Sequence, residues 1–357
     1  MLRQILTVPH RPATRYVQSS DCPCRSSADE ISSVKTDVLS DVLRAVRLTG
    51  AAYFDFELSS PWVREAPPAR DLAGLVMPGA QRVIEYHLIA KGSCWGQAIG
   101  LGEPIRLGEG DVILFPRGDA HVISSEPGMR ERVDIAAFPD RSTPLPVFYE
   151  IGGGGPERAR LVCCFLGCDD RPYNPLLDAL PSVIHLSATR AHSTAEWLGQ
   201  LMSTAAIESR SARPGGENVL ARLSELMFVE TIRQYLATLP LSESGWLAGL
   251  RDPIVGHALA ALHREPAAPW TVERLARAVA ISRSVLAERF TDLVGQPPMQ
   301  YLALWRMQLA SRLLIDGRPL AAIADAVGYE SEASFSRAFK KLVGHSPAAW
   351  RQTQQRR

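Results

Sequence analysis

The feature that most constrains the fold is a helical unit that occurs twice near the C-terminus. One copy begins at Leu275 and reads LARAVAISRSVLAERFTDLVGQPPMQYL, and the other begins at Ile323 and reads IADAVGYESEASFSRAFKKLVGHSPAAW. Three pairs of residues match at a constant spacing of 49 positions, namely Phe290 with Phe339, Gly295 with Gly344, and Pro298 with Pro347. The second copy has one extra residue in its turn. A repeat at fixed spacing indicates two copies of one supersecondary unit.

Each copy predicts a helix-turn-helix. A short amphipathic helix is followed by a turn and by a second helix, which begins after a capping serine, Ser282 in the first copy and Ser331 in the second. In helix-turn-helix proteins the first helix supports the second, which lies in the major groove of DNA. The two small cores are predicted to contain Leu275, Val279, Leu286 and Phe290 in the first copy and Ile323, Val327, Phe335 and Phe339 in the second.

The side chains that remain outside these cores on the second helices are the candidates for contact with base edges. They are Arg283, Ser284, Ala287 and Glu288 in the first copy and Glu332, Ala333, Ser336 and Arg337 in the second. Among them, Arg337 can bind a guanine with two hydrogen bonds. Between the copies, residues 298–317 have the periodicity of a long helix, which would hold the two second helices at a fixed separation. The candidates for phosphate contact are Arg312, Arg318, Lys340 and Lys341.

The charge of the chain is divided unevenly. Residues 251–357 contain 15 Arg and Lys against 9 Asp and Glu, whereas residues 1–250 contain 24 against 29. This basic C-terminal third indicates a polyanion as its partner. No apolar run approaches the roughly 20 residues of a membrane-spanning helix, and Pro9, His10 and Arg11 interrupt the apolar stretch that a secretory signal would need. We therefore expect a cytoplasmic protein with no membrane partner.

The rest of the chain divides into three segments. Residues 1–34 are polar and aperiodic, as is typical of a disordered leader. Residues 191–250 have helical periodicity and either cover the preceding domain or form a dimer interface. Between them, residues 35–190 contain short β-forming runs bounded by glycine and proline, which favour a sandwich or a small barrel. The runs are AAYFDFEL, RVIEYHLIA, SCWGQAI, PIRL, DVILFP, HVISS, RVDIAAF and ARLVCCFLG.

Candidate ligands for a metal or an effector lie on these runs. Alternation along a strand places Glu85 and His87 on one face, and the stretch GDVILFPRGDAHVIS presents His121 after a tight turn. Three cysteines on the same runs are Cys94, Cys163 and Cys168. A mixed cysteine and histidine site would hold Zn²⁺ or respond to oxidants, whereas buried cysteines act as small apolar groups. The chain has six cysteines, too few for a disulfide scaffold, so we expect reduced thiols.

The C-terminal segment resembles a known family of DNA-binding proteins. From Leu320 the sequence reads LAAIADAVGYESEASFSRAFKKLVGHSPAAWR, which is similar to the signature of the AraC/XylS family of bacterial transcription regulators. The resemblance extends from about Asp252 to Arg351. It implies an all-helical domain with two helix-turn-helix subdomains joined by a linker helix, and binding to promoter DNA. The base-reading positions that it implies are Ser284, Ala287 and Glu288 in the first subdomain and Glu332, Ala333, Ser336 and Arg337 in the second.

The preceding domain resembles the cupin-type sensor domains that stand before such DNA-binding domains. The resemblance covers residues 36–190 through YHLIAKGSCW, LGEGDVILFPRGDAHVIS and LVCCFLGCDDRPYNPLLDALPSVIHL. The residues that fit the second cupin motif are Gly110, Pro116, Gly118 and His121. Ser125 replaces the asparagine of that motif, and Lys91 and Gly92 stand where the first motif has a glutamate. The resemblance implies a domain that binds an effector and does not turn over a substrate.

These observations predict an α+β fold, with a cupin-like β-barrel at residues 35–190, helices at 191–250 and an AraC-type DNA-binding domain at 251–357. The expected function is a transcription regulator controlled by a small effector, or by a metal or redox signal, and not an enzyme. The alternative is a cupin metalloenzyme, such as a dioxygenase or an isomerase, with a DNA-binding appendage. The implied partners are promoter DNA, RNA polymerase as for an activator, a small-molecule effector and a second copy of the chain. The one cofactor implied is a divalent metal in the barrel.

Overall fold

The computed structural model describes residues 37–46, 48–135, 147–168, 172–188, 193–211, 213–240 and 244–355. The leader predicted at residues 1–34 lies outside these ranges. The elements of the N-terminal part are α1 (Val38–Val46), β1 (Leu48–Ser59), β2 (Val63–Ala66), α2 (Ala69–Val76), β3 (Arg82–Lys91), β4 (Cys94–Ala98), β5 (Leu101–Leu107), β6 (Val112–Phe115), β7 (His121–Ser124), β8 (Val147–Gly152), β9 (Arg158–Cys168), α3 (Pro175–Ala179) and β10 (Ile184–Leu186).

Helices make up the described chain after β10. They are α4 (Ser193–Ser211), α5 (Gly216–Thr238), α6 (Trp246–Arg251), α7 (Pro253–Arg264), α8 (Val272–Ala278), α9 (Arg283–Val294), α10 (Pro298–Ile315), α11 (Leu320–Ala326), α12 (Glu332–Val343) and α13 (Pro347–Gln355). None of the described helices is both long and apolar enough to cross a membrane.

Two sheets form the N-terminal part. The larger has the strand order β10-β6-β3-β9-β1-β8, and the smaller has the order β2-β7-β4-β5. Strand β1 pairs antiparallel with β9 on one side and parallel with β8 on the other. Apolar side chains from both sheets pack in one core, among them Phe54 and Phe115 from the larger sheet and Leu107 and Ile123 from the smaller. The predicted sheet-rich domain is confirmed, although the two sheets are not paired edge to edge into a closed barrel within the described residues.

One predicted strand is wrong where it can be compared. Residues 132–135 of the run RVDIAAF form no strand, and the remainder of that run lies outside the described residues. Side chains just before it bind β2, because Arg130 donates two hydrogen bonds to the Glu65 carboxylate and Glu131 accepts one from the Glu65 backbone N–H. The segment is therefore held to the sheet through side chains, and its backbone does not extend the strand ladder.

Alternation along the strands separates two environments. On β3, Val83 packs in the core between the sheets, and Glu85 and His87, which have the same parity, line a cavity there. The intervening Tyr86 and Leu88 belong to the core on the other face of the larger sheet. Both faces of β3 are buried, and the polar side chains Glu85 and His87 interrupt its apolar residues only on the face toward the cavity.

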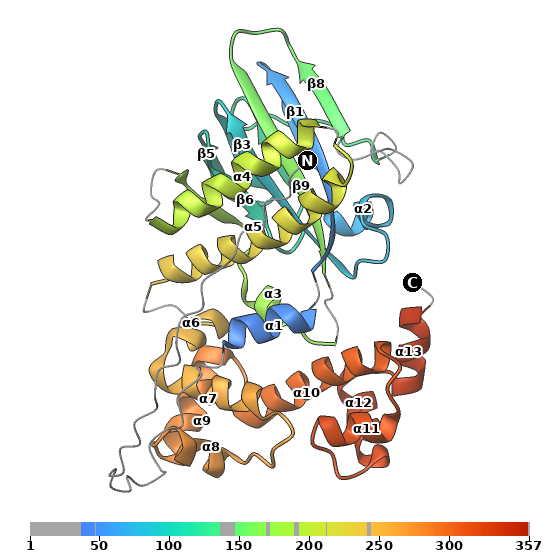
Figure 1. Cartoon of the computed structure of the whole chain (residues 1–357). Coiled ribbons are helices and arrows are strands. Elements are labelled where there is room, and N and C mark those ends of the chain that lie inside the picture. The colour runs from blue at the N-terminus through green and yellow to red at the C-terminus, as the bar shows by residue number, and fades with distance from the viewer. Residues whose placement is uncertain are drawn as a thin grey trace, which may run out of the picture. The chain divides into compact units, whose positions relative to one another are not determined.

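Helices α4 and α5 cover the outer face of the larger sheet (Figure 1). Buried side chains such as Leu201 of α4 and Met227 of α5 contribute to the core beneath them. Both helices also leave large apolar side chains exposed, namely Trp197 and Ile207 on α4 and Val219 and Leu226 on α5. Of the two roles predicted for these helices, the covering role is present in the structure, and the dimer interface stays a prediction.

The duplicated segments form the two predicted helix-turn-helix units, α8 with α9 and α11 with α12, and α10 lies between them in the sequence. The predicted core residues are buried in both units, except that Val279 is partly buried. The predicted caps are also present, because the Ser282 hydroxyl accepts the Val285 N–H at 3.3 Å and the Ser331 hydroxyl accepts the Ser334 N–H at 3.2 Å.

The turn differs between the two units at one position. In each unit a valine follows the first helix, Val279 after α8 and Val327 after α11. The next residue is Ala280 in the first unit, at φ 56°, and Gly328 in the second, at φ 76°. A side chain at Gly328 would bring its Cβ within 2.3 Å of the Ala267 carbonyl oxygen. Positive φ favours glycine, so Ala280 holds a strained conformation that its counterpart avoids.

Candidate functional site

The second helix of each unit turns a polar face to solvent. Of the predicted base-reading residues, the exposed ones are Arg283, Ser284, Glu288, Glu332, Ala333 and Arg337, and the half-buried ones are Ala287 and Ser336. The opposite faces of the helices are anchored by Phe290 and Phe339, which are fully buried. Each of α9 and α12 thus has the amphipathic arrangement that a groove-reading helix requires.

Two arginines of α9 are engaged within the protein. The Arg283 Nε lies 2.6 Å from the Glu273 Oε1, and both side chains are exposed. An exposed ion pair contributes little free energy, so Arg283 can exchange this partner for another. Arg289 was not among the predicted site residues, and it donates from Nε to Asp252 Oδ2 at 3.0 Å. Because Asp252 also caps α7, Arg289 has a structural role.

The predicted phosphate contacts differ in exposure. Lys340 and Lys341 are exposed in the last turn of α12, and Arg318 is exposed just beyond α10. Arg312 is half-buried on α10. The two lysines and Arg318 are therefore free to meet solvent-borne anions, and Arg312 is less accessible.

A cavity of about 200 Å³ lies between the two sheets. Its walls are largely apolar, with the aromatic side chains Phe54, Phe56, Tyr149 and Phe165 among them. Four of the predicted site residues, Glu85, His87, His121 and Cys163, line it. A mostly apolar cavity with a few converging polar groups is typical of a small-molecule site.

Three polar side chains of the cavity, His121, His87 and Cys163, form one hydrogen-bonded chain. His121 Nδ1 lies 3.0 Å from the Asp119 carbonyl oxygen, His121 Nε2 lies 2.6 Å from His87 Nε2, and His87 Nδ1 lies 2.7 Å from the Cys163 Sγ. A carbonyl oxygen only accepts, so His121 Nδ1 carries the hydrogen. Nε2 of neutral His121 then accepts from His87, and His87 Nδ1 accepts from the Cys163 thiol.

Burial fixes the protonation of this cluster. Burial raises the pKa of Glu85 well above its ordinary value, and burial, with a smaller contribution from His121, lowers the pKa of His87 well below its ordinary value. Burial lowers the pKa of His121 to about 4 and raises that of the Cys163 thiol well above its ordinary range. Burial therefore favours the uncharged form of all four groups.

The cluster does not fit the divalent metal that a cupin fold suggests. Two nitrogen ligands about 2.0–2.1 Å from one tetrahedral metal lie roughly 3.3 Å apart, whereas the two Nε2 atoms of His87 and His121 are 2.6 Å apart. The other nitrogen of His87 faces Cys163, on the opposite side of its ring. No group of three histidine, cysteine or acidic side chains suited to a metal ion occurs within the described residues.

The predicted cysteines are not brought together. Cys163 lines the cavity, whereas Cys94 packs in the core between the sheets without lining it. Cys168 lies in the core on the other face of the larger sheet. Cys163 and Cys168 are on one strand at positions of opposite parity, so strand alternation already separates them. The sequence prediction also missed the aromatic walls, which the alternation of Phe54 and Phe56 in AAYFDFEL could have indicated.

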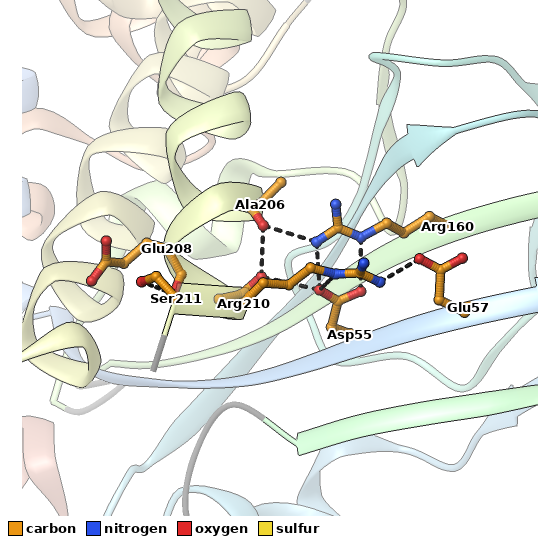
Figure 2. Close-up of polar contacts among 8 residues, drawn as sticks. Asp55, Glu57, Arg160, Ala206, Glu208, Arg210 and Ser211 are labelled. Atoms are coloured by element: carbon orange, nitrogen blue, oxygen red, sulfur yellow. Dashed lines mark hydrogen bonds and ion pairs between the residues drawn. The ribbon is translucent and has the colours of Figure 1, made fainter. Parts of the chain in front are cut away.

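On the outer face of β1, Asp55 ties the larger sheet to α4 (Figure 2). Arg160 of β9 donates to its two carboxylate oxygens at 3.0 and 2.6 Å and to the Ala206 carbonyl of α4 at 2.8 Å. The Ser209 hydroxyl and the Arg210 guanidinium of α4 also donate to Asp55. Asp55 is fully buried, and a buried carboxylate is stable only when it is paired in this way.

Comparison with known proteins decides the family. A family model described as a cupin matches residues 37–237, and one described as a helix-turn-helix domain matches residues 275–353. An AraC-like transcription regulator of Streptomyces lividans is 38% identical over 281 residues, which cover 76% of this chain and 88% of the relative. This chain belongs to the family of AraC-like transcription regulators. Since the family consists of regulators, the alternative of a cupin metalloenzyme is not supported.

Other members of the AraC-like family extend the comparison. The HTH-type transcriptional regulator AlkR of Acinetobacter baylyi is 33% identical over 277 residues, which cover 76% of this chain and 89% of AlkR. Among solved structures, the DNA-binding domain of AdpA, in complex with a target DNA, is 30% identical. The match covers 30% of this chain and 96% of the AdpA domain, with a TM-score of 0.28.

Proposed function

We propose that this AraC-family regulator binds promoter DNA through α9 and α12, and that a small molecule in the cavity of its cupin domain changes its affinity for that DNA. One observation carries the proposal: the same chain combines two helix-turn-helix units with exposed polar faces and a cavity that encloses polar side chains. A domain with a purely structural role would fill this space with apolar side chains, whereas a sensor needs room and hydrogen-bonding groups for its ligand.

Arg337 is the proposed specificity contact, and Lys340 is the proposed phosphate contact. Arg337 is exposed in the N-terminal half of α12, the half that faces base edges in helix-turn-helix complexes. Lys340 lies one turn later on α12. A cation at this place would contact a DNA phosphate and position the helix without reading the base sequence. The excess of basic residues in the C-terminal third supports binding to a polyanion.

These assignments predict different effects for two single substitutions. Arg337→Ala should remove about 1–3 kcal/mol of discrimination at one base position, whereas Lys340→Ala should weaken binding about equally for all sequences and lower the salt slope by about one. The measurement is selection of duplexes from a random pool with the full chain, followed by anisotropy titrations of the preferred site. An Arg337→Ala chain with an unchanged base preference would show that α12 does not read DNA through this residue.

The proposed path from the cavity starts at β1. Phe54 and Phe56 line the cavity from this strand, and Asp55 between them binds α4 on the other face. A ligand that shifts β1 therefore acts on α4 through Arg160 and Ser209. Allosteric coupling of this kind is typically about 1–3 kcal/mol, or roughly 5- to 150-fold in affinity.

The further proposed partners are a second copy of the chain and RNA polymerase, and the proposed effect is activation of transcription in the cytoplasm, where promoter DNA lies. The homodimer is supported by the large apolar side chains that α4 and α5 leave exposed, namely Trp197, Ile207, Val219 and Leu226. Exposed aromatic side chains such as Trp197 are enriched at protein interfaces. Sedimentation of the Trp197→Glu chain beside the wild type tests the dimer.

A further inference from the structure

Glu85 is the polar group of the cavity that lacks a partner. Its side chain is 1% exposed, and neither carboxyl oxygen has a hydrogen-bond partner within the described part of the chain. The nearest ring nitrogen, His121 Nε2, is 3.8 Å from Glu85 Oε2 and already accepts from His87. Leaving a buried carboxyl without a partner costs free energy. A ligand that donates a hydrogen bond to Glu85 would recover that free energy.

The sheet that carries Glu85 also contributes the aromatic rings of the cavity, and Phe165 lies directly beside Glu85 on the neighbouring strand. The rings of Phe54 and Phe165 meet edge to face at 5.4 Å, and those of Phe56 and Tyr149 stack at 5.0 Å. The faces of aromatic rings attract cations that approach within about 6 Å, which is how aromatic cages bind organic ammonium groups. Rings alone would suit any apolar ligand, but rings that share a cavity with an unpartnered carboxyl favour a cation.

The other charged groups of the lining do not favour an anion. Arg64 Nη1 lies 3.5 Å from Glu131 Oε1. The Cζ of Arg64 also lies 5.8 Å from the centroid of the Phe56 ring. Glu65 is bound by Arg130. An anion would therefore meet a paired arginine and an acidic residue. The cavity of about 200 Å³ is somewhat larger than the roughly 150 Å³ apolar cavity that binds benzene, so one ring with a short chain would fit.

We propose that the effector cavity of this regulator binds a small organic ammonium ion, whose N–H groups donate to Glu85 and whose carbon skeleton packs on the aromatic walls. This inference rests on the proposed effector site and names its ligand class. Without a ligand, burial raises the pKa of Glu85 and favours its protonated carboxyl. When the ammonium ion binds, Glu85 releases that proton to solvent, and its carboxylate accepts hydrogen bonds from the ligand, so the ligand keeps its charge and the pair is neutral.

The test is calorimetric titration of the full chain with three probes that share a phenyl ring and a two-carbon chain: 2-phenylethylammonium, 2-phenylethanol and phenylacetate. We expect the ammonium probe to bind at least about tenfold more tightly than the alcohol and the carboxylate, because a charged hydrogen bond contributes about 1.5–3 kcal/mol. Titrations in buffers of different ionisation enthalpy should also show release of a proton with the ammonium probe and none with the alcohol.

Glu85→Gln removes the charge with little change of shape and should lower affinity for the ammonium probe at least about tenfold. Glu150→Gln is the matched control, since Glu150 is exposed on β8 beside Tyr149 and does not line the cavity. Thermal melts verify that both variants fold. Absence of ammonium binding at millimolar concentration, equal binding of the alcohol, or an unaffected Glu85→Gln chain would overturn the inference. Because no DNA is present, these outcomes leave the proposed control of DNA binding to be judged by its own assay.

Discussion

At the scale of single residues, the buried carboxyl of Glu85 ties the stability of the chain to pH. Its pKa is raised in the folded state, whereas an unfolded glutamate titrates at about 4.3. Below that pH both states are protonated and the contribution is fully present. As pH rises toward the folded pKa, the unfolded chain loses its proton first, so this contribution to stability is lost.

Glu85→Gln should remove the fall in stability that the ionisation of Glu85 causes as pH rises. The free energy of unfolding of the variant, relative to the wild type, should therefore increase as pH rises above about 4.3. Urea unfolding of both chains in mildly acidic and mildly alkaline buffers measures the difference. A pH-independent difference between the two chains would mean that Glu85 is ionised or solvated in the folded state.

Ala280 offers a second prediction at this scale. Its φ of 56° is a conformation that glycine adopts without strain, so Ala280→Gly should raise the free energy of unfolding by up to about 1 kcal/mol, less the entropy that glycine adds to the unfolded chain. The matched change, Gly328→Ala, should destabilise strongly because the new Cβ would meet the Ala267 carbonyl oxygen. Thermal melts of the two variants compare them, and destabilisation by Ala280→Gly would contradict the strain.

At the scale of elements, Asp55 joins β1, β9 and α4, and its loss should be costly. Asp55→Asn leaves Arg160, whose side chain is 17% exposed, without its anionic partner, and breaking a buried pair in this way costs about 3–5 kcal/mol. Arg210→Gln is the control, since Arg210 is 45% exposed and should cost no more than about 1 kcal/mol. Chemical denaturation measures both, and equal effects would show that the network does not hold α4.

The elements differ in how far sequence could predict them. The helix-turn-helix pairs follow from local periodicity and from a repeat, because each small core forms between neighbours in the chain. Glu85 and His87 follow from alternation within one strand. The contact between Asp55 and Arg160 depends on the register of β1 with β9, which no local pattern contains. Strand β8 was not predicted, although its residues alternate between half-buried and exposed positions.

At the scale of the whole molecule, the excess of basic residues and the buried polar cluster lie in different domains. The basic excess lies in the helical third that carries α9 and α12, and the buried polar cluster lies in the cupin domain. In the proposed function, ligand binding in the cavity changes the affinity of the helical third for DNA. A ligand does so only by the difference in its affinity for two conformations, so a change in the cavity should alter the response and leave intrinsic DNA affinity intact.

The measurement that tests this claim most directly pairs a transcriptional reporter with DNA binding for one double variant, His87→Leu with His121→Leu. The reporter carries the promoter that the chain selects, and thermal melts establish that the variant folds. We expect DNA affinity to stay within about twofold of the wild type while the response to inducing conditions is lost, because a coupling of about 1–3 kcal/mol has been removed. A folded double variant that binds the promoter and still responds as the wild type does would contradict the account.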